Sequence, residues 1–193
     1  YFKHPETKRW VNYIGALHRR HKLIVCEMKL RSFNHNSPIK ININTNIWPI
    51  KFIDTPFKQF DILSEKYKNK SKGRIPLPIS AQHIWSQHKY SVMARDIKKY
   101  KEIGQYVSKV NPNQCFSDLS NDLVELLRIK PSLGGIKNSL QHMWGYFKKD
   151  NTNINVRGLD LRKLLSIIQE LSYEKKEKYI LESTALSELE AWI

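Results

Sequence analysis

The stretch richest in chemically active side chains is SQHKYSVMARDIKKYKEIG, residues 86–104, with one histidine, two tyrosines, five cations and only two acids. Cations at this density suit phosphate groups, and aromatic rings can stack on nucleobases. The pattern therefore predicts a nucleic-acid contact, which we assign to His88, Lys89, Tyr90, Arg95, Lys98 and Lys99. The alternative for the tyrosines is that their rings pack in the core while the lysines are solvated.

Motifs of common enzyme classes do not occur in the sequence: there is no Gly-rich phosphate loop, HExxH or GxSxG. Asp118 and Asp122 lie four residues apart, where they could pair as catalytic carboxylates or favour a helix start. The histidine spacings, with no acid nearby, favour hydrogen-bonded imidazoles over metal ligands. Cys26 and Cys115 form no CxxC pair. We therefore assign no catalytic residue and expect no metal and no cofactor.

The net charge of +15 is confined to the first part of the chain. Residues 1–110 contain 22 Lys/Arg and 7 Asp/Glu, whereas residues 111–193 contain 11 of each. An AT-rich genome, which favours Lys, Asn and Ile, would raise the charge of both parts, so the asymmetry favours a polyanionic partner. His, Tyr and Trp beside the cations favour nucleic acid over a membrane. Further contacts are predicted at Lys8, Arg9, Arg19, Arg20, Lys22, Lys148 and Lys149.

The hydrophobic spacing predicts an all-α fold, a helical bundle of about seven helices with an irregular loop at 34–56. One long helix is expected over 5–33, with Ile14, Leu17 and Ile24 among its inward residues. Alternating isoleucines at 39–43 would also suit a short strand. Later helices are predicted at 57–67, 117–129, 131–147, 159–171 and 172–193, with Trp144 and Phe147 on the core face of the helix at 131–147. A further helix is expected to start at the N-cap Ser80, with a continuation through Val107 that Asp96 caps. The chain divides into 1–75 and 76–193, or forms one continuous domain.

Two later blocks resemble a known family. The first block, HKYSVMA with Tyr100 and Gly104, resembles the HKYxxMA…Y…LG pattern of the YbgA-like domain of unknown function. The second block, NSLQHMWGYFKK at 138–149, resembles the NxLxHxxGYFKK pattern of the same family. The resemblance covers about residues 78–149, and the chain departs from the family at 150–193, where the usual Pro-containing segment and Leu-Leu-His-Tyr motif do not occur. The further motif positions are Met93, Tyr100, Gly104, Asn138, His142, Gly145 and Tyr146.

The N-terminal part resembles the pyrimidine dimer DNA glycosylase family over about residues 1–40. The family has a GYxxHP segment, a helix and an E-x-x-x-RGY-x-H ending. In this sequence the similar segments are YFKHP, then Arg9-Trp10, then Glu27-Met28 and SFNH at 32–35, with motif residues His4, Pro5 and His35. Residues 74–100 are also compatible with a later helix of that family.

The glycosylase resemblance implies cutting of DNA at ultraviolet-induced dimers. The nucleophile of the family is the N-terminal α-amine, which attacks the sugar C1′ and forms a Schiff base, while a glutamate assists and a nucleotide is flipped out. Both catalytic groups precede the HP segment, and Tyr1 aligns after them. No catalytic residue is therefore carried over, and we expect this chain to lack the first helix of such an enzyme.

Three hypotheses for the function follow. The first is a DNA-repair-associated nucleic-acid-binding protein resembling a dimer glycosylase without its catalytic segment. The second is a non-catalytic YbgA-like helical module with a protein or RNA partner, and the third is a helical interaction protein without nucleic-acid affinity. We expect the first, in the cytoplasm, with double-stranded DNA as the partner and no membrane contact. The sequence gives no information about the oligomeric state.

Overall fold

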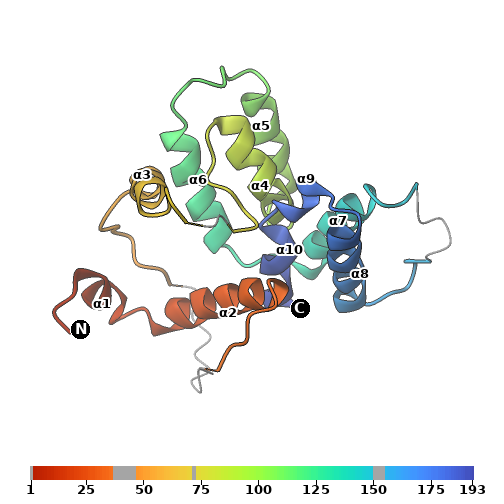
Figure 1. Cartoon of the computed structure of the whole chain (residues 1–193), viewed down its shortest axis with the longest axis horizontal. Coiled ribbons are helices and arrows are strands. Elements are labelled where there is room, and N and C mark those ends of the chain that lie inside the picture. Colours follow the sequence, from red (N-terminus) through yellow and green to blue (C-terminus); the bar gives the residue numbers. More distant parts are fainter. Residues whose placement is uncertain (1, 37–46, 71–72, 150–154) are drawn as a thin grey trace.

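The computed structural model describes residues 2–36, 47–70, 73–149 and 155–193, and over these ranges its regular elements are all helices (Figure 1). The helices of 11 to 17 residues are α2 (Ile14–Leu30), α3 (Pro56–Lys66), α4 (Ala81–Met93), α5 (Ile97–Val107), α6 (Ser117–Arg128), α7 (Leu133–Trp144) and α8 (Leu161–Glu174). The shorter ones are α1 (Pro5–Trp10), α9 (Lys178–Leu181), α10 (Ala185–Glu188) and the 3-10 helix η1 (Leu189–Trp192). The predicted all-α bundle of about seven helices is confirmed.

Side-chain caps start several of these helices where the sequence indicated. The Ser80 hydroxyl accepts a hydrogen bond from the His83 N–H at 3.2 Å, and Asp96 accepts from the first turn of α5 at 2.8 and 2.9 Å. Such caps satisfy amide groups that have no partner inside the helix. Residues 47–55 form no helix, as predicted for the loop, whereas 37–46 and the alternative strand at 39–43 lie outside the described residues.

The single helix predicted over 5–33 is wrong in two respects. The chain leaves the helix at residues 11–13 and so forms α1 and α2. The predicted inward residues Ile14, Leu17 and Ile24 are 45%, 40% and 51% exposed, whereas Ala16 and Cys26 are buried. α2 is buried on this other side because it packs against α10 and η1 there, and small side chains allow a close approach.

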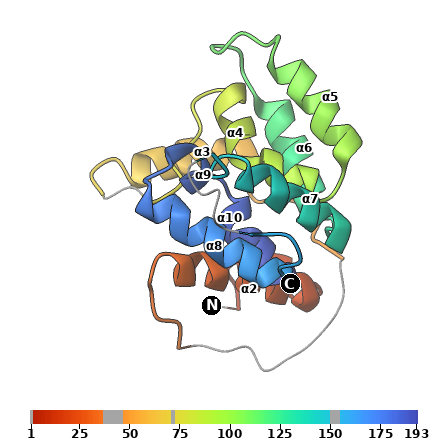
Figure 2. The ribbon, with the colours of Figure 1, turned by 90° about the vertical axis from the view of Figure 1, so that its right-hand side faces the viewer.

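The C-terminal segment lies at the centre of the molecule. The predicted single helix at 172–193 is wrong, because α8 ends at Glu174 and the chain then forms α9, α10 and η1. Ile180, Leu186 and Leu189 are fully buried there. In Figures 1 and 2, α10 lies between α2 on one side and α4, α7 and α8 on the other. This segment therefore connects the N-terminal helices to the rest.

Two hydrophobic clusters form the core, and α4 contributes to both. One cluster joins α4 to α7, α8, α9 and α10, and the other joins it to α5 and α6, with Phe57 and Phe60 of α3 at its edge. Trp144 and Phe147, expected in the core, are 6% and 1% exposed. Because α2 packs on α10 and α3 on α6, the parts before and after residue 75 share contacts, and their division into domains stays a prediction.

Candidate nucleic-acid interface and a tyrosine–lysine cluster

Helix α1 is held to its surroundings by an arginine as well as by the buried ring of Trp10. The guanidinium of Arg9 donates to the Lys51 carbonyl at 2.6 Å and pairs with Glu6 at 3.2 Å, and its side chain is only 10% exposed. Glu6 also accepts a hydrogen bond from the Trp10 indole at 3.1 Å. Arg9 was predicted to contact phosphate, but in this position its charge is largely used inside the protein.

Other cations of the N-terminal region do face solvent. The only acids among residues 2–36 are Glu6 and Glu27, and both are bound by arginines. Within the described ranges, no ion pair with an acid occurs at the exposed cations of this region. These five exposed cations, which lie on more than one side of α1 and α2, are what we call the N-terminal basic surface: Lys3, Lys8, Arg20, Lys22 and Lys29.

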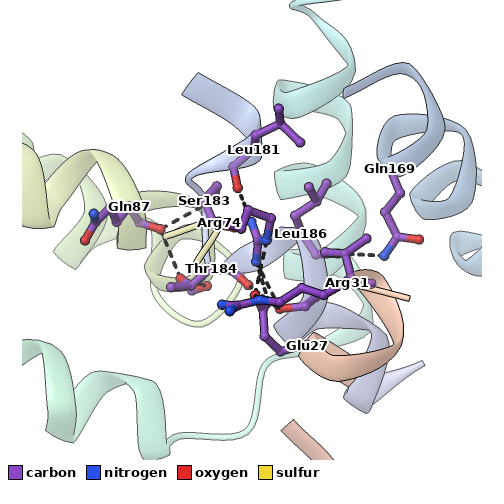
Figure 3. A network of polar contacts seen from close by, with 12 residues as sticks. Glu27, Arg31, Arg74, Gln87, Gln169, Leu181, Ser183, Thr184 and Leu186 are labelled. Carbon is purple, nitrogen blue, oxygen red and sulfur yellow. Dashed lines mark hydrogen bonds and ion pairs between the residues drawn. The ribbon is translucent and has the colours of Figure 1, made fainter. Parts of the chain in front are cut away.

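The inner side of α2 carries a buried polar network that fixes the helix in place (Figure 3). The Glu27 carboxylate accepts hydrogen bonds from Arg31 at 2.6 Å, Arg74 at 2.5 Å and the Ser187 hydroxyl at 2.5 Å. Arg74 also donates to the Ser183 carbonyl at 2.8 Å. Burial by itself raises the pKa of Glu27, but the hydrogen bonds from Arg74 and Ser187 outweigh it and hold this pKa below its usual range.

Arg19 and Arg20 were predicted to act together on phosphate, but the structure separates them. The Arg19 guanidinium lies 3.9 Å from the ring centroid of Trp192 and donates to the Ala191 carbonyl at 3.2 Å. Adjacent residues on a helix point about 100° apart, so Arg20 faces solvent instead. Arg19 therefore helps to hold α2 against the C-terminal segment, and only Arg20 contributes to the N-terminal basic surface.

Three predicted contacts on and after α4 point inward. Tyr90 is 3% exposed, and the side chain of Arg95 is fully buried in an ion pair with Glu188. The Nδ1 of His88 lies 3.1 Å from the Thr184 hydroxyl. Burial lowers the pKa of His88 to about 4, with the charge of Arg95 acting in the same direction and that of Glu188 against it. His88 and Arg95 contact the start and end of α10, and Tyr90 is buried, so we leave all three out of the outer interface.

Helix α5 carries a second exposed cationic region. Lys98 and Lys101 are exposed, and Lys99 is exposed but pairs with Glu102 at 2.9 Å. Figures 1 and 2 place α5 and α2 at opposite ends of the molecule. The two cationic stretches singled out in the sequence therefore do not form one continuous surface.

A separate cluster gathers around Lys89. Its Nζ lies 4.7 Å from the ring centroid of Tyr90 and 4.5 Å from that of Tyr179, distances typical of cation–π contacts. The ring of Tyr146 stacks on Tyr179 with centroids 5.3 Å apart and an interplanar angle of 26°. We call Lys89, Tyr90, Tyr146 and Tyr179 the tyrosine–lysine cluster. Lys148 and Lys149, both exposed, follow Tyr146 in the chain.

The sequence reasoning missed Tyr179. It lies on the four-residue helix α9, outside both family patterns, so no spacing connects it with α4. Two predicted motif residues remain apart from the cluster: Asn138 is half-buried on α7 and His142 is exposed.

Other residues of the later motif have packing roles. Met93 is 2% exposed. The ring of Tyr100 lies 5.6 Å from that of Trp85, and a side chain at Gly104 would come within 3.8 Å of the same indole. Gly145 caps the C-terminus of α7. These motif residues therefore take part in packing in both hydrophobic clusters.

The residues of the earlier motif begin and follow the N-terminal helices. The Nδ1 of His4 accepts the Glu6 N–H at 3.3 Å, and Pro5 occupies the first turn of α1. The ring of His35 meets that of His21 edge to face at 4.9 Å. Among the described residues, no group of three His, Cys, Asp or Glu side chains is placed to hold a metal ion. No helix in the described ranges is long and apolar enough to cross a membrane.

Comparison with protein families gives two matches, in agreement with both resemblances. The family described as "Pyrimidine dimer DNA glycosylase" matches residues 1–41, which contain the N-terminal basic surface. The family described as "Protein of unknown function (DUF1722)" matches residues 89–157, which contain Lys89, Tyr90 and Tyr146. No curated protein and no solved structure matches the chain.

Proposed function

We propose that this chain is a DNA-repair-associated protein that binds double-stranded DNA through its N-terminal basic surface. The observation that carries the proposal is the set of five exposed cations on the segment similar to pyrimidine dimer DNA glycosylases, where both acids are already bound by arginines. Cations without acidic partners neutralise phosphates and release counterions, which gives salt-dependent affinity.

The interior contacts support this role because they hold the cations in a fixed frame. Glu27 with Arg74, and Arg19 with Trp192, attach α2 to the C-terminal segment. A surface held in this way presents its charges without a large ordering cost when DNA binds. We assign no catalytic residue to this chain.

Fluorescence anisotropy with undamaged and ultraviolet-irradiated duplexes over a range of salt concentrations tests the proposal. If each of the five cations neutralises a phosphate, the slope of log affinity against log salt is about −4 to −5. Lys22→Gln with Lys29→Gln should weaken binding uniformly over sequence and reduce the slope by about 2. The matched control is Lys163→Gln with Lys178→Gln, which removes the same charge from lysines on α8 and α9 whose side chains are 74% and 84% exposed.

Equal losses in the two double variants would show that only net charge matters, and would contradict the assignment of the surface. Tighter binding of the irradiated duplex supports the connection to repair. Salt-sensitive binding without lesion preference would favour the second candidate, a non-catalytic helical module. That candidate is supported by the longer of the two family matches, at residues 89–157.

A further inference from the structure

The tyrosine–lysine cluster has no role in the duplex contact proposed above. Its members come from α4, from the turn after α7 and from α9, whereas the N-terminal basic surface lies on and beside α1 and α2. In Figures 1 and 2, α10 lies between α9 and α2, and the Arg74 side chain bridges Glu27 of α2 to the Leu181 carbonyl of α9. The cluster therefore requires its own explanation.

The four side chains of the cluster differ in burial in a way that leaves one ring accessible. Tyr90 is 3% exposed and forms the floor, Lys89 and Tyr179 are half-buried, and Tyr146 is 44% exposed. Because Tyr146 already stacks on Tyr179, its ring is held in place before any ligand arrives. A fixed, partly exposed aromatic ring is a stacking platform for another planar group.

The charges around the ring indicate which planar group would fit. Within the described ranges no ion pair with an acid occurs at Lys89, whose ammonium contacts two tyrosine faces. Lys148 and Lys149 are exposed two and three residues after Tyr146. A ligand that combines a flat ring with a nearby anion complements this arrangement, and a nucleotide has both.

The groups of the cluster suit binding. Burial raises the pKa of Tyr90 and a hydrogen bond with Tyr146 raises it further, so this phenol stays neutral. Lys89 adds a cation that is held against two ring faces. The cluster therefore offers a ligand stacking surfaces, phenol hydroxyls and a cation.

We infer that the tyrosine–lysine cluster binds a nucleotide of single-stranded nucleic acid, with the base stacked on Tyr146 and the adjoining phosphate paired with Lys89. This site goes beyond the proposed duplex contact and is formed by other residues. A protein with both sites holds a duplex at one surface and an unpaired segment at another.

Binding of a fluorescent oligothymidylate of about ten nucleotides measures this site directly. Tyr146→Leu should weaken binding at least about fivefold, in line with the usual effect of losing one stacking contact. Lys89→Gln should weaken binding and lower its salt dependence. The matched control is Tyr106→Leu, because Tyr106 is a similarly exposed tyrosine, 49% against 44%, on α5. Thermal melting of each variant checks that it is folded.

Unchanged binding by Tyr146→Leu, or an equal loss with Tyr106→Leu, overturns the assignment. A competition arm separates the two sources of nucleotide. In this arm, thymidine monophosphate and an unlabelled oligomer each compete with the probe. If the two displace the probe equally well, the site binds free nucleotides and the single-strand assignment is overturned. Duplex affinity of Tyr146→Leu should stay unchanged, so failure of this inference is distinguishable from failure of the duplex surface.

Discussion

The contact between α7 and the end of α4 gives a sharp prediction, because two adjacent glycines differ in their surroundings. Gly134 and Gly135 both lie in the first turn of α7, after the Ser132 cap. A Cβ on Gly134 would meet nothing within 4 Å. A Cβ on Gly135 would lie 2.8 Å from the carbonyl carbon of Ala94, closer still to its oxygen, and 3.0 Å from the Ser132 hydroxyl.

The two alanine substitutions should therefore have opposite signs. Without a clash, Gly→Ala in a helix stabilises by up to about 1 kcal/mol, which is the expectation for Gly134→Ala. At Gly135 the clash is with backbone, so α7 or α4 must shift. Overpacking of this kind costs about 1–3 kcal/mol, and disturbing the Ser132 cap costs about 1 kcal/mol more. We expect Gly135→Ala to lower the free energy of unfolding by about 1–3 kcal/mol after the helix gain is subtracted.

Thermal and urea denaturation of both variants measure the difference. For a chain of this size, each kcal/mol shifts Tm by about 2–4 °C, so Gly135→Ala should melt roughly 2–12 °C lower. Gly134→Ala should melt at or slightly above the temperature of the unmodified protein. Equal stability of the two variants would refute the close approach of α7 to Ala94, and with it the position of Tyr146 relative to Lys89.

Two further predictions concern the buried polar groups. Arg74→Met leaves the Glu27 carboxylate without its main partner and should lower the free energy of unfolding, measured in urea, by about 3 kcal/mol. Adding Glu27→Gln should recover part of this loss, and no recovery would argue against direct pairing. His88 takes up a proton near pH 6.5 in the unfolded chain but only near pH 4 in the folded protein. The free energy of unfolding should therefore fall as the pH drops through this window, by at most about 3 kcal/mol. His88→Asn should flatten the change in urea midpoint between about pH 7 and about pH 5, and an unaltered change would show that other groups cause it.

Local features of the fold could be predicted from the sequence because local chemistry determines them. Ser80 and Asp96 cap helices through their own side chains, and the spacing around Trp144 and Phe147 indicates a single apolar face. The orientation of α2 could not be predicted in this way. Its apolar stripe, which contains Ile14, faces solvent because distant residues of α10 and η1 cover the opposite side.

The candidate site was predictable only in part, for a similar reason. The motif residues Lys89, Tyr90 and Tyr146 were identified by spacing and resemblance, and the structure brings them together. Their fourth member, Tyr179, comes from a short helix that only tertiary packing places beside them. A nonlocal member of a cluster leaves no periodic signal, so the cluster becomes visible only in three dimensions.

Several arginines are buried in ion pairs whereas most lysines are exposed, and this difference changes how the net charge relates to the proposed interface. Arg74 and Arg95 have side chains that are 5% and 0% exposed, and each guanidinium satisfies a carboxylate together with backbone carbonyls. A planar fork with five donors suits such interior sites, whereas the compact, strongly hydrated ammonium of lysine stays in water. Part of the charge excess in residues 1–110 is consequently neutralised inside the molecule, since Arg95 of that part pairs with Glu188 of the other. Among the described residues of 1–110, the charge available to phosphate is therefore that of the exposed lysines and Arg20, and a DNA surface must be located from these side chains rather than from the formal total.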